Sequence, residues 1–580
     1  MSIFNLRELR TLSLSSNNFS GSFPLNDIQQ LKNLQELYLS YNSLLINHYS
    51  SNSSYSFPQL RALKLAARKL RTFPDFLRNQ SILGLLDLSL NQIHEIPNWI
   101  WRLSGLYILN LSCNSLVNLP GPFLNLTSQL FMLDLHSNQL QGQIPMLPPS
   151  AGYLDYSRNN FSSSIPADIG DFLMQTAFFS LASNHIHGII PESVCKATLF
   201  LEVLDLSNNS LSGMIPQCLT AINGPLAVLD LRRNKLSGTL PDNFPENCSL
   251  QTLDLNGNVI GGQFPKSLAN CRMLEVLNLG NNQITDVFPC LLKNISSLRV
   301  LVLRFNKFYD SIECLKTKSA WPKLQIVDIA RNNFTGEIPG SFLKTWQAMM
   351  ADKDGAVSKQ FQVVDLGQVY YQDTVTVTTK GLEMEFIKIL TVLTLIDMSC
   401  NNFNGSIPEE VGKLKSLYGL NLSSNALTCA IPSSLGNLRQ LESLDLSDNK
   451  LSGTIPSEFS KLNFLSFLNL SSNQLVGKIP TGTQIQSFSP DSFTCNKGLY
   501  GPPLDDGSPR LPPTLEGKHS NSAHRIDWDL ISVEVGFIVG FGVAVGSLVL
   551  CKRWSKWYYK TMYKILVKIF PQLEERIGPH

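Results

Sequence analysis

The chain has 580 residues, of which 43% are hydrophobic and 16% are charged, and its formal net charge is +2. This balance gives no support for a nucleic-acid ligand, because nucleic-acid-binding domains are usually strongly basic. One hydrophobic core rarely extends over this length, so several domains or a repeat array are expected.

A pattern of Leu-x-x-Leu-x-Leu followed by Asn recurs about every 24 residues from Leu9 to Asn473. This period is typical of a leucine-rich-repeat solenoid, here with about 18 coils. Each leucine segment predicts a short strand with inward leucines, so the stacked coils should form a parallel inner sheet in an α/β repeat fold. The following Asn, as in Asn209, Asn234 and Asn449, is expected to bond backbone groups as a ladder. A Leu-x-Gly-x-Ile-Pro segment then turns the chain.

The repeats are interrupted between Pro339 and Leu393 by about 45 extra residues. The sequence therefore predicts about 14 coils over residues 1–345, an insertion at 346–390, four coils over 391–480 and a C-terminal cap at 481–504. Insertions in repeat proteins lie on one face and often bind. The segment from Thr374 to Thr379 alternates Thr and Val, which predicts a strand, and Lys380-Gly381 predicts its turn.

The Leu-x-Gly-x-Ile-Pro segment resembles the plant-specific repeat of receptor kinases, kinase-lacking receptor-like proteins and polygalacturonase-inhibiting proteins. An island with Tyr370, Tyr371, Lys380 and Gly381, four repeats from the end of the array, is similar to that of receptor-like proteins that detect pathogens at the plant cell surface. Residues 247–289 resemble the same proteins closely. The resemblance implies an extracellular ligand-binding domain, with these four residues as candidates for binding a co-receptor kinase.

Residues 530–551 are apolar and long enough to cross a hydrocarbon core of about 30 Å. A basic tail follows at 552–580 and a linker precedes at 505–529, so the positive-inside rule predicts a single-pass type I plasma-membrane protein with its repeats outside the cell. A buried core helix is the alternative. The array begins at once, without a secretory signal or the usual N-terminal cap, and we therefore expect an N-terminally truncated sequence.

About 29 residues follow Cys551, too few for a kinase domain, so a signal must pass through a partner. Gly536, Gly540 and Ala544 share one face of the predicted span, which favours close helix packing. Glycine is also common in membrane helices without such a role. The resemblance implies association with an adaptor receptor-like kinase and, after ligand binding, with a co-receptor kinase.

No spacing of His, Cys, Ser or Asp matches a catalytic or metal-binding motif, so we expect no enzyme, cofactor or metal site. The inner face carries a basic and partly aromatic stretch, and such residues are favoured in interfaces. Solvated charges are the alternative. The ligand-contact candidates are Arg232, Arg233, Arg304, Phe305 and Arg331.

Asn-x-Ser/Thr sequons are numerous, as in a secreted glycoprotein. Asn79, Asn125 and Asn294 lie outside the predicted strands and are the favoured glycosylation sites, whereas Asn110, Asn421 and Asn469 lie within "LNLS" strands.

Cys290 and Cys314 occupy the same register in adjacent coils, and Cys248 and Cys271 are offset by one, so stacking is expected to bring each pair close; both disulfides and buried thiols fit them. In the cap, Tyr500 stands where the family has Cys and Cys495 where it has Gly, so the usual cap disulfide is in doubt.

The sequence thus favours a cell-surface receptor that binds a microbial or damage-derived peptide, protein or glycan and signals through kinases in plant innate immunity. A developmental receptor subunit for an endogenous peptide is one alternative. An inhibitor of secreted cell-wall hydrolases is another, although it would need no membrane span.

Overall fold

The computed structural model describes residues 3–46, 57–119, 130–145, 148–149, 151–221, 223–314, 321–351, 364–365, 370–386, 389, 393–482 and 484–504. The chain divides into two units, Met1–Gly507 and Ser508–His580, and all the described residues belong to the first. The helices among these residues are all too short or too polar to span a bilayer. The predicted span at 530–551, with Gly536, Gly540 and Ala544, lies outside them, as do its flanking segments and Asn125.

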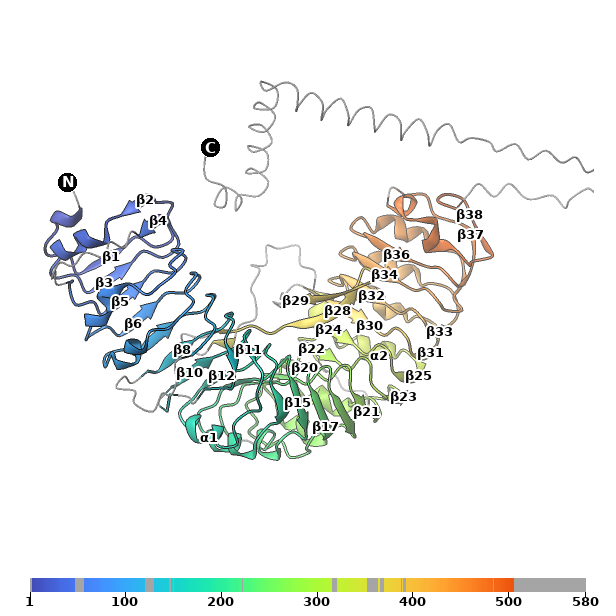
Figure 1. Ribbon diagram of the computed structural model, residues 1–580. Coiled ribbons are helices and arrows are strands. Elements are labelled where there is room, and N and C mark those ends of the chain that lie inside the picture. Colours follow the sequence, from blue (N-terminus) through green and yellow to red (C-terminus); the bar gives the residue numbers. More distant parts are fainter. Residues whose placement is uncertain are drawn as a thin grey trace, which may run out of the picture. The chain divides into compact units, whose positions relative to one another are not determined.

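The first unit is a solenoid whose inner face is an 18-stranded parallel sheet (Figure 1). Successive repeats supply neighbouring strands in register, so that Leu204 pairs with Leu229 and Leu229 with Leu253. The predicted leucine-rich-repeat fold is confirmed. In spatial order the strands are β1 (Thr11–Ser13), β3 (Glu36–Tyr38), β5 (Ala62–Lys64), β6 (Leu85–Asp87), β7 (Ile108–Asn110), β8 (Met132–Asp134), β10 (Tyr153–Asp155), β12 (Phe178–Ser180), β14 (Val203–Asp205), β16 (Val228–Asp230), β18 (Thr252–Asp254), β20 (Val276–Asn278), β22 (Val300–Val302), β24 (Ile326–Asp328), β30 (Leu395–Asp397), β32 (Gly419–Asn421), β34 (Ser443–Asp445) and β36 (Phe467–Asn469).

A second set of parallel strands follows the inner ones, before the chain turns outward. At Gly213 and Gly453 the φ angles are +78° and +76°, a region that glycine adopts without strain. These strands are β2 (Ser20–Phe23), β4 (Ser43–Ile46), β9 (Gln141–Gly142), β11 (Asn160–Phe161), β13 (His187–Ile189), β15 (Ser210–Gly213), β17 (Lys235–Thr239), β19 (Val259–Gly262), β21 (Gln283–Ile284), β23 (Tyr309–Ser311), β25 (Asn333–Glu337), β31 (Asn402–Gly405), β33 (Ala426–Leu427), β35 (Ser452–Gly453), β37 (Gln474–Lys478) and β38 (Gly498–Tyr500).

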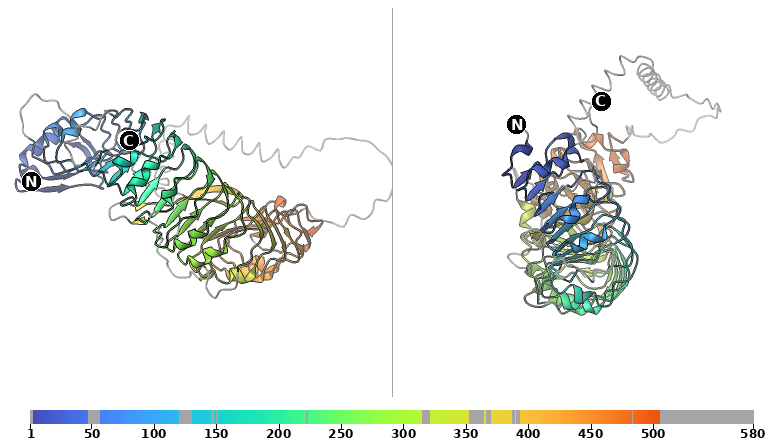
Figure 2. Two further views of the ribbon diagram at one scale, coloured as in Figure 1. Left: turned by 90° about the horizontal axis from the view of Figure 1, so that it is seen from below. Right: turned by 60° about the vertical axis from the view of Figure 1, so that its left-hand side comes forward.

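Short helices carry the chain back along the outer side of the coils (Figure 2). Most begin directly after the Pro of the repeat, which fixes one backbone angle and needs no donor there. The α-helices are α1 (Ile169–Phe172), α2 (Gly340–Leu343) and α3 (Gln347–Met350), and the 3₁₀ helices are Ile3–Asn5, Leu25–Gln30, Asp75–Asn79, Asn98–Arg102, Glu192–Ala197, Gln217–Leu219, Lys266–Asn270, Cys290–Asn294, Glu409–Lys413, Ser433–Asn437, Ser457–Lys461, Ile485–Ser487 and Pro490–Phe493.

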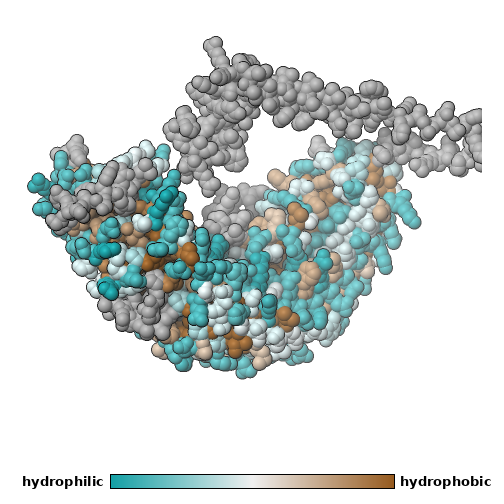
Figure 3. Space-filling model, in the orientation of Figure 1, coloured by the Kyte–Doolittle hydropathy of each residue, from teal (hydrophilic) through white to brown (hydrophobic). Residues whose placement is uncertain are grey.

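The core is one continuous cluster made mostly of leucines, with an asparagine ladder beside it. Asn234 donates to the carbonyls of Leu206 and Leu231 at 3.0 and 3.1 Å and accepts from the Leu211 N–H at 2.9 Å. The same pattern recurs along the array, which confirms the predicted ladder. The face seen in Figure 3 is largely hydrophilic, with separate apolar patches.

Three disulfides join adjacent repeats: Cys195–Cys218, Cys248–Cys271 and Cys290–Cys314. For Cys248–Cys271 and Cys290–Cys314, the sequence did not decide between a disulfide and two buried thiols. It did not predict Cys195–Cys218. Among the described residues, Cys495 is an exposed free thiol, so this position of the cap forms no disulfide.

Candidate functional site: the island on the inner sheet

The island forms a β-hairpin from β28 (Val375–Thr379) and β29 (Leu382–Phe386). Lys380 and Gly381 both have positive φ, +53° and +73°, which is the geometry of a two-residue type I′ turn. The predicted strand and its turn are therefore confirmed. A short antiparallel pair, β26 (Val364–Asp365) and β27 (Tyr370–Tyr371), precedes the hairpin.

The island segment from Tyr371 to Phe386 lies across the inner sheet, roughly along the direction in which the coils stack (Figures 1 and 2). At its start, the Tyr371 hydroxyl donates to Asp230 at 2.9 Å. At the turn, the Lys380 N–H donates to Ser443 at 3.0 Å, and the Lys380 ammonium lies 2.8 Å from Glu442. The segment thus joins coils that are more than two hundred residues apart in sequence.

One side of the island packs on apolar residues at the start of the inner strands. Val375 and Val377 are at most 2% exposed and pack with Val276, Val300 and Ile326. Tyr371 packs in a second cluster with Phe178, Val203 and Val228. These valines face away from the leucine core, so a partner on the inner face is what buries them.

The other side of the hairpin is polar and meets arginines at the ends of the inner strands. Arg304 donates to Thr378 at 3.0 Å and to Glu383 at 2.8 Å, Arg232 donates to Thr374, and Arg233 donates to Glu385 at 3.1 Å. The side chains of Arg304 and Arg232 are only 6% and 16% exposed. Three of the five ligand-contact candidates therefore bind the island, and two of these three are largely covered.

Phe305 and Arg331, the other two candidates, lie together at the open edge of this region. The Arg331 guanidinium is 4.6 Å from the centre of the Phe305 ring, and Arg304 stacks on the same ring at 5.2 Å. Both Phe305 and Arg331 are exposed. Such a cation–π pair offers an apolar and a charged contact to a ligand.

A row of aspartates occupies the last position of the inner strands beneath the island. Burial, followed by the negative charge of a neighbouring aspartate, raises the pKa of Asp205 to about 7 and that of Asp254 to about 8. The same two causes raise the pKa of Asp328 to about 8, and burial raises that of Asp230. The row did not stand out in the sequence because Leu-Asp-Leu is part of the ordinary repeat.

A second polar group lies on the inner face near the N-terminal coils. His136 Nδ1 is 2.7 Å from Asp134 and 3.9 Å from Asp155, and the Cys113 thiol is 3.7 Å from His136 Nε2. Burial lowers the pKa of His136, but the hydrogen bond and charge of Asp134 outweigh it, so the net shift is upward. Burial raises the pKa of the Cys113 thiol, which disfavours a nucleophilic role.

Other predicted positions lie apart from the island. Asn79 and Asn294 are exposed, as glycosylation requires, whereas Asn421 donates to Asp397 at 3.3 Å within the inner sheet.

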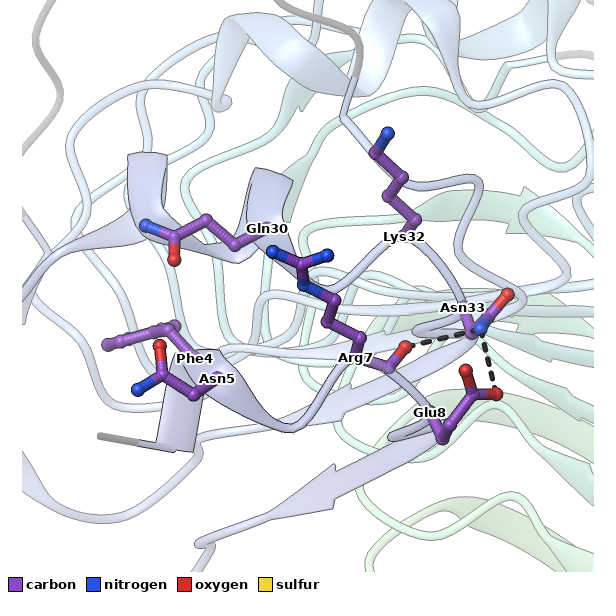
Figure 4. A pocket seen from close by; sticks show the side chains of 7 residues that line it. All are labelled: Phe4, Asn5, Arg7, Glu8, Gln30, Lys32 and Asn33. Atoms are coloured by element: carbon purple, nitrogen blue, oxygen red, sulfur yellow. Dashed lines mark hydrogen bonds between the residues drawn. The ribbon is translucent and has the colours of Figure 1, made fainter. Parts of the chain in front are cut away.

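A surface pocket at the first two coils is lined by Phe4, Asn5, Arg7, Glu8, Gln30, Lys32 and Asn33 (Figure 4). Its one described network joins Asn33 to Glu8 and to the Arg7 carbonyl, and it brings no predicted site residue together.

Family models for leucine-rich repeats match residues 224–284, 248–308 and 415–475, and also 8–31, 200–222, 323–344 and 392–414. Receptor-like protein 18 of Arabidopsis thaliana is 35% identical over 97% of this chain and 64% of its own length. Receptor-like protein 7 of the same plant is 44% identical over 96% of this chain and 56% of its own length. The chain thus spans less than two thirds of these relatives.

Among solved structures, the Arabidopsis receptor kinase HAESA, in complex with the peptide hormone IDA and the co-receptor SERK1, is similar with a TM-score of 0.59. It is 26% identical, and the match covers 87% of this chain and 88% of that one. The repeat pattern, the solenoid and the long matches to receptor-like proteins agree with one another. The chain is a leucine-rich-repeat solenoid that is similar over nearly its whole length to the receptor-like proteins of plants.

Proposed function

We propose that this protein is a subunit of a plant cell-surface receptor that binds a microbial or damage-derived ligand and signals through partner kinases in innate immunity. The observation that carries the proposal is the island docked on the inner sheet, since it places an exposed, chemically mixed surface beside a fixed scaffold. The solenoid itself offers a rigid array of coils and needs no catalytic group for this role.

The proposed ligand surface is formed by Phe305 and Arg331 together with the exposed edge of the hairpin. Leu382 and Met384 are 66% and 40% exposed on β29, and the Glu383 side chain is 61% exposed. Apolar, acidic and basic contacts therefore lie close together, which suits a peptide or protein ligand. Lys380 and Gly381, at the tip of the hairpin, are the proposed contact for a co-receptor kinase, together with the last four coils.

An assay in leaves tests the ligand surface. Leaves that express the full-length chain with an added secretion signal are challenged with pathogen extracts, and the oxidative burst is measured. We expect a burst that Phe305→Ala with Arg331→Ala reduces several-fold at equal surface level, and that the exposed control Arg439→Ala leaves unchanged. No burst above untransformed leaves, or equal bursts from all three proteins, would contradict the proposal.

We propose that an adaptor receptor-like kinase binds through the face of Gly536, Gly540 and Ala544 in the span at 530–551. Replacing Gly536 and Gly540 with Leu keeps the span apolar but blocks close helix approach, at a cost of about 1–2 kcal/mol. Co-precipitation of the adaptor should fall while the surface level stays constant, and Ile538→Leu, on another face, should have no effect. If the double variant binds the adaptor as well as the parent does, the contact lies outside the span and the proposal is wrong.

A developmental role is the second candidate, because HAESA is described in complex with a peptide hormone. The same leaf assay separates the two candidates. A response to extracts of unchallenged plant tissue, with none to pathogen extracts, would favour an endogenous peptide.

A further inference from the structure

Five carboxyl groups meet two largely covered guanidinium groups where the island crosses the inner sheet. The carboxyl groups belong to Asp205, Asp230, Asp254, Asp328 and Asp373, and each of these residues is at most 9% exposed. Arg232 lies 3.5 Å from Asp230 and 3.7 Å from Asp254, and Arg304 lies 3.4 Å from Asp328. If all five were ionised, the negative charges would outnumber these two cations within a covered interface, which is costly.

The other charged groups around the island are already engaged with one another. Arg233 pairs with Glu385 and Lys380 with Glu442, while Glu383 adds a further negative charge beside Arg304, which already pairs with Asp328. Beneath the hairpin, Arg299 lies 3.6 Å from Glu275. None of these pairs supplies a spare positive charge to the aspartates, so protonation is the remaining way to lower the buried negative charge.

The hydrogen bonds at Asp373 fit a protonated carboxyl group in the docked island. One oxygen of Asp373 accepts from the Thr252 hydroxyl at 2.7 Å, while the other is buried without a hydrogen-bond partner among the described residues. Tyr371, next but one, donates its hydroxyl to Asp230. Burial raises the pKa of Asp373 to about 7, despite the opposing hydrogen bond from Thr252.

We propose that the island is a pH-dependent latch, which closes on the inner sheet in acidic solution and opens as the pH rises above neutrality. When the island lifts, Asp373 returns to water and the aspartates of the sheet lose their cover. The open state therefore binds protons more weakly than the closed state. Because protons bind the closed state preferentially, raising the pH up to about 7–8 favours opening, and the effect levels off above that range.

Opening would change what the inner sheet offers to a ligand. It would uncover the apolar patch of Val276, Val300 and Ile326 and break the bonds of Arg232 and Arg304 to the island. The latch thus couples access to this surface to the pH outside the cell. The inference rests on the docked island alone and does not depend on which ligand binds.

Hydrogen–deuterium exchange of the purified full-length chain between pH 6 and pH 8.5, corrected for the intrinsic amide rates, tests the latch. The opening constant of residues 375–386 should rise at least tenfold, while β5, β6 and β7, which lie away from the island, keep their protection. Asp373→Asn removes one titrating proton and should reduce the pH effect about tenfold. The exposed control Asp448→Asn should behave as the parent.

Constant hairpin protection across this range would overturn the latch. So would a full parental pH effect in Asp373→Asn, or a loss of protection in β5 to β7 at the same pH as in the hairpin, since the last result would mean global unfolding. If Asp373→Asn does not fold, its strands β5 to β7 lose their protection at every pH. The pH series of the parent chain then decides whether the latch exists.

Discussion

Single polar side chains of two kinds support this fold: asparagines that satisfy backbone groups inside the solenoid, and arginines that fix the island. The asparagines repeat because every coil leaves the same carbonyls and N–H groups without a strand partner. The arginines that bind the island, Arg232, Arg233 and Arg304, lie where it crosses the sheet. The first kind is visible in the repeat pattern, whereas the second becomes recognisable only with its partners in place.

Asn258 illustrates the first kind. It donates to the carbonyls of Leu231 and Leu255 and accepts from the Leu236 N–H, all at 3.0 Å, and it is 9% exposed. Asn258→Ala leaves these buried groups unpaired, and we expect a loss of about 2–4 kcal/mol, seen as a lower midpoint of thermal unfolding. Asn402→Ala removes only an exposed bond to Asn333 and should change little. Equal midpoints for the two variants would refute the role of the ladder.

Arg304 illustrates the second kind. Arg304→Met removes the bonds to Thr378 and Glu383 and leaves the carboxyl group of Asp328 buried without its cation. Amides of β28 and β29 should exchange at least tenfold faster than in the parent. Arg331→Met, which loses only an exposed contact to Phe305, serves as the control. If both variants exchange alike, Arg304 does not hold the hairpin.

At the scale of elements, the sequence predicts what is local and misses what is long-range. The period of the leucines gives the inner strands, and the Thr-Val alternation with Lys380-Gly381 gives the hairpin, because each depends on neighbouring residues. The docking of that hairpin depends on contacts such as Tyr371 with Asp230, 141 residues apart. No local pattern encodes such a pairing. The sequence could therefore mark Arg232 and Arg304 as candidate contact residues, but it could not show that they bind the island.

The hairpin turn gives an element-scale prediction. Gly381 has a φ of +73°, and a Cβ atom there would lie 3.2 Å from the Phe467 ring. Gly381→Ala should therefore destabilise the turn by about 1–2 kcal/mol and speed exchange in β28 and β29. Gly84→Ala meets only ordinary contacts, at 3.6 Å from the Arg61 carbonyl, and serves as the control. Unchanged exchange in Gly381→Ala would mean that the docked faces, rather than the turn, fix the hairpin.

For the whole solenoid, stability is the sum of many contacts between adjacent coils, because each coil touches only its neighbours. The three disulfides reinforce that sum in one region, since all of them lie between Cys195 and Cys314. This is also the region whose inner face carries Arg232 and Arg304 beneath the island. The cross-links therefore strengthen the coils that must hold their spacing for the island to dock.

The last prediction concerns these cross-links. Each closes a loop of about two dozen residues and should contribute about 3 kcal/mol by restricting the unfolded chain. Reduction should lower the thermal midpoint and speed exchange first in coils 195–314, with the hairpin loosening alongside them and the last four coils, which contain no disulfide, responding later. Alkylation before reduction, followed by peptide mass spectrometry, should label Cys429 and Cys495, the exposed free thiols in the described part of the chain, and spare the six bridged cysteines. Labelling of Cys195, Cys248 or Cys290 without reduction, or a uniform response of all coils, would show that the bridges do not set the stability of this region.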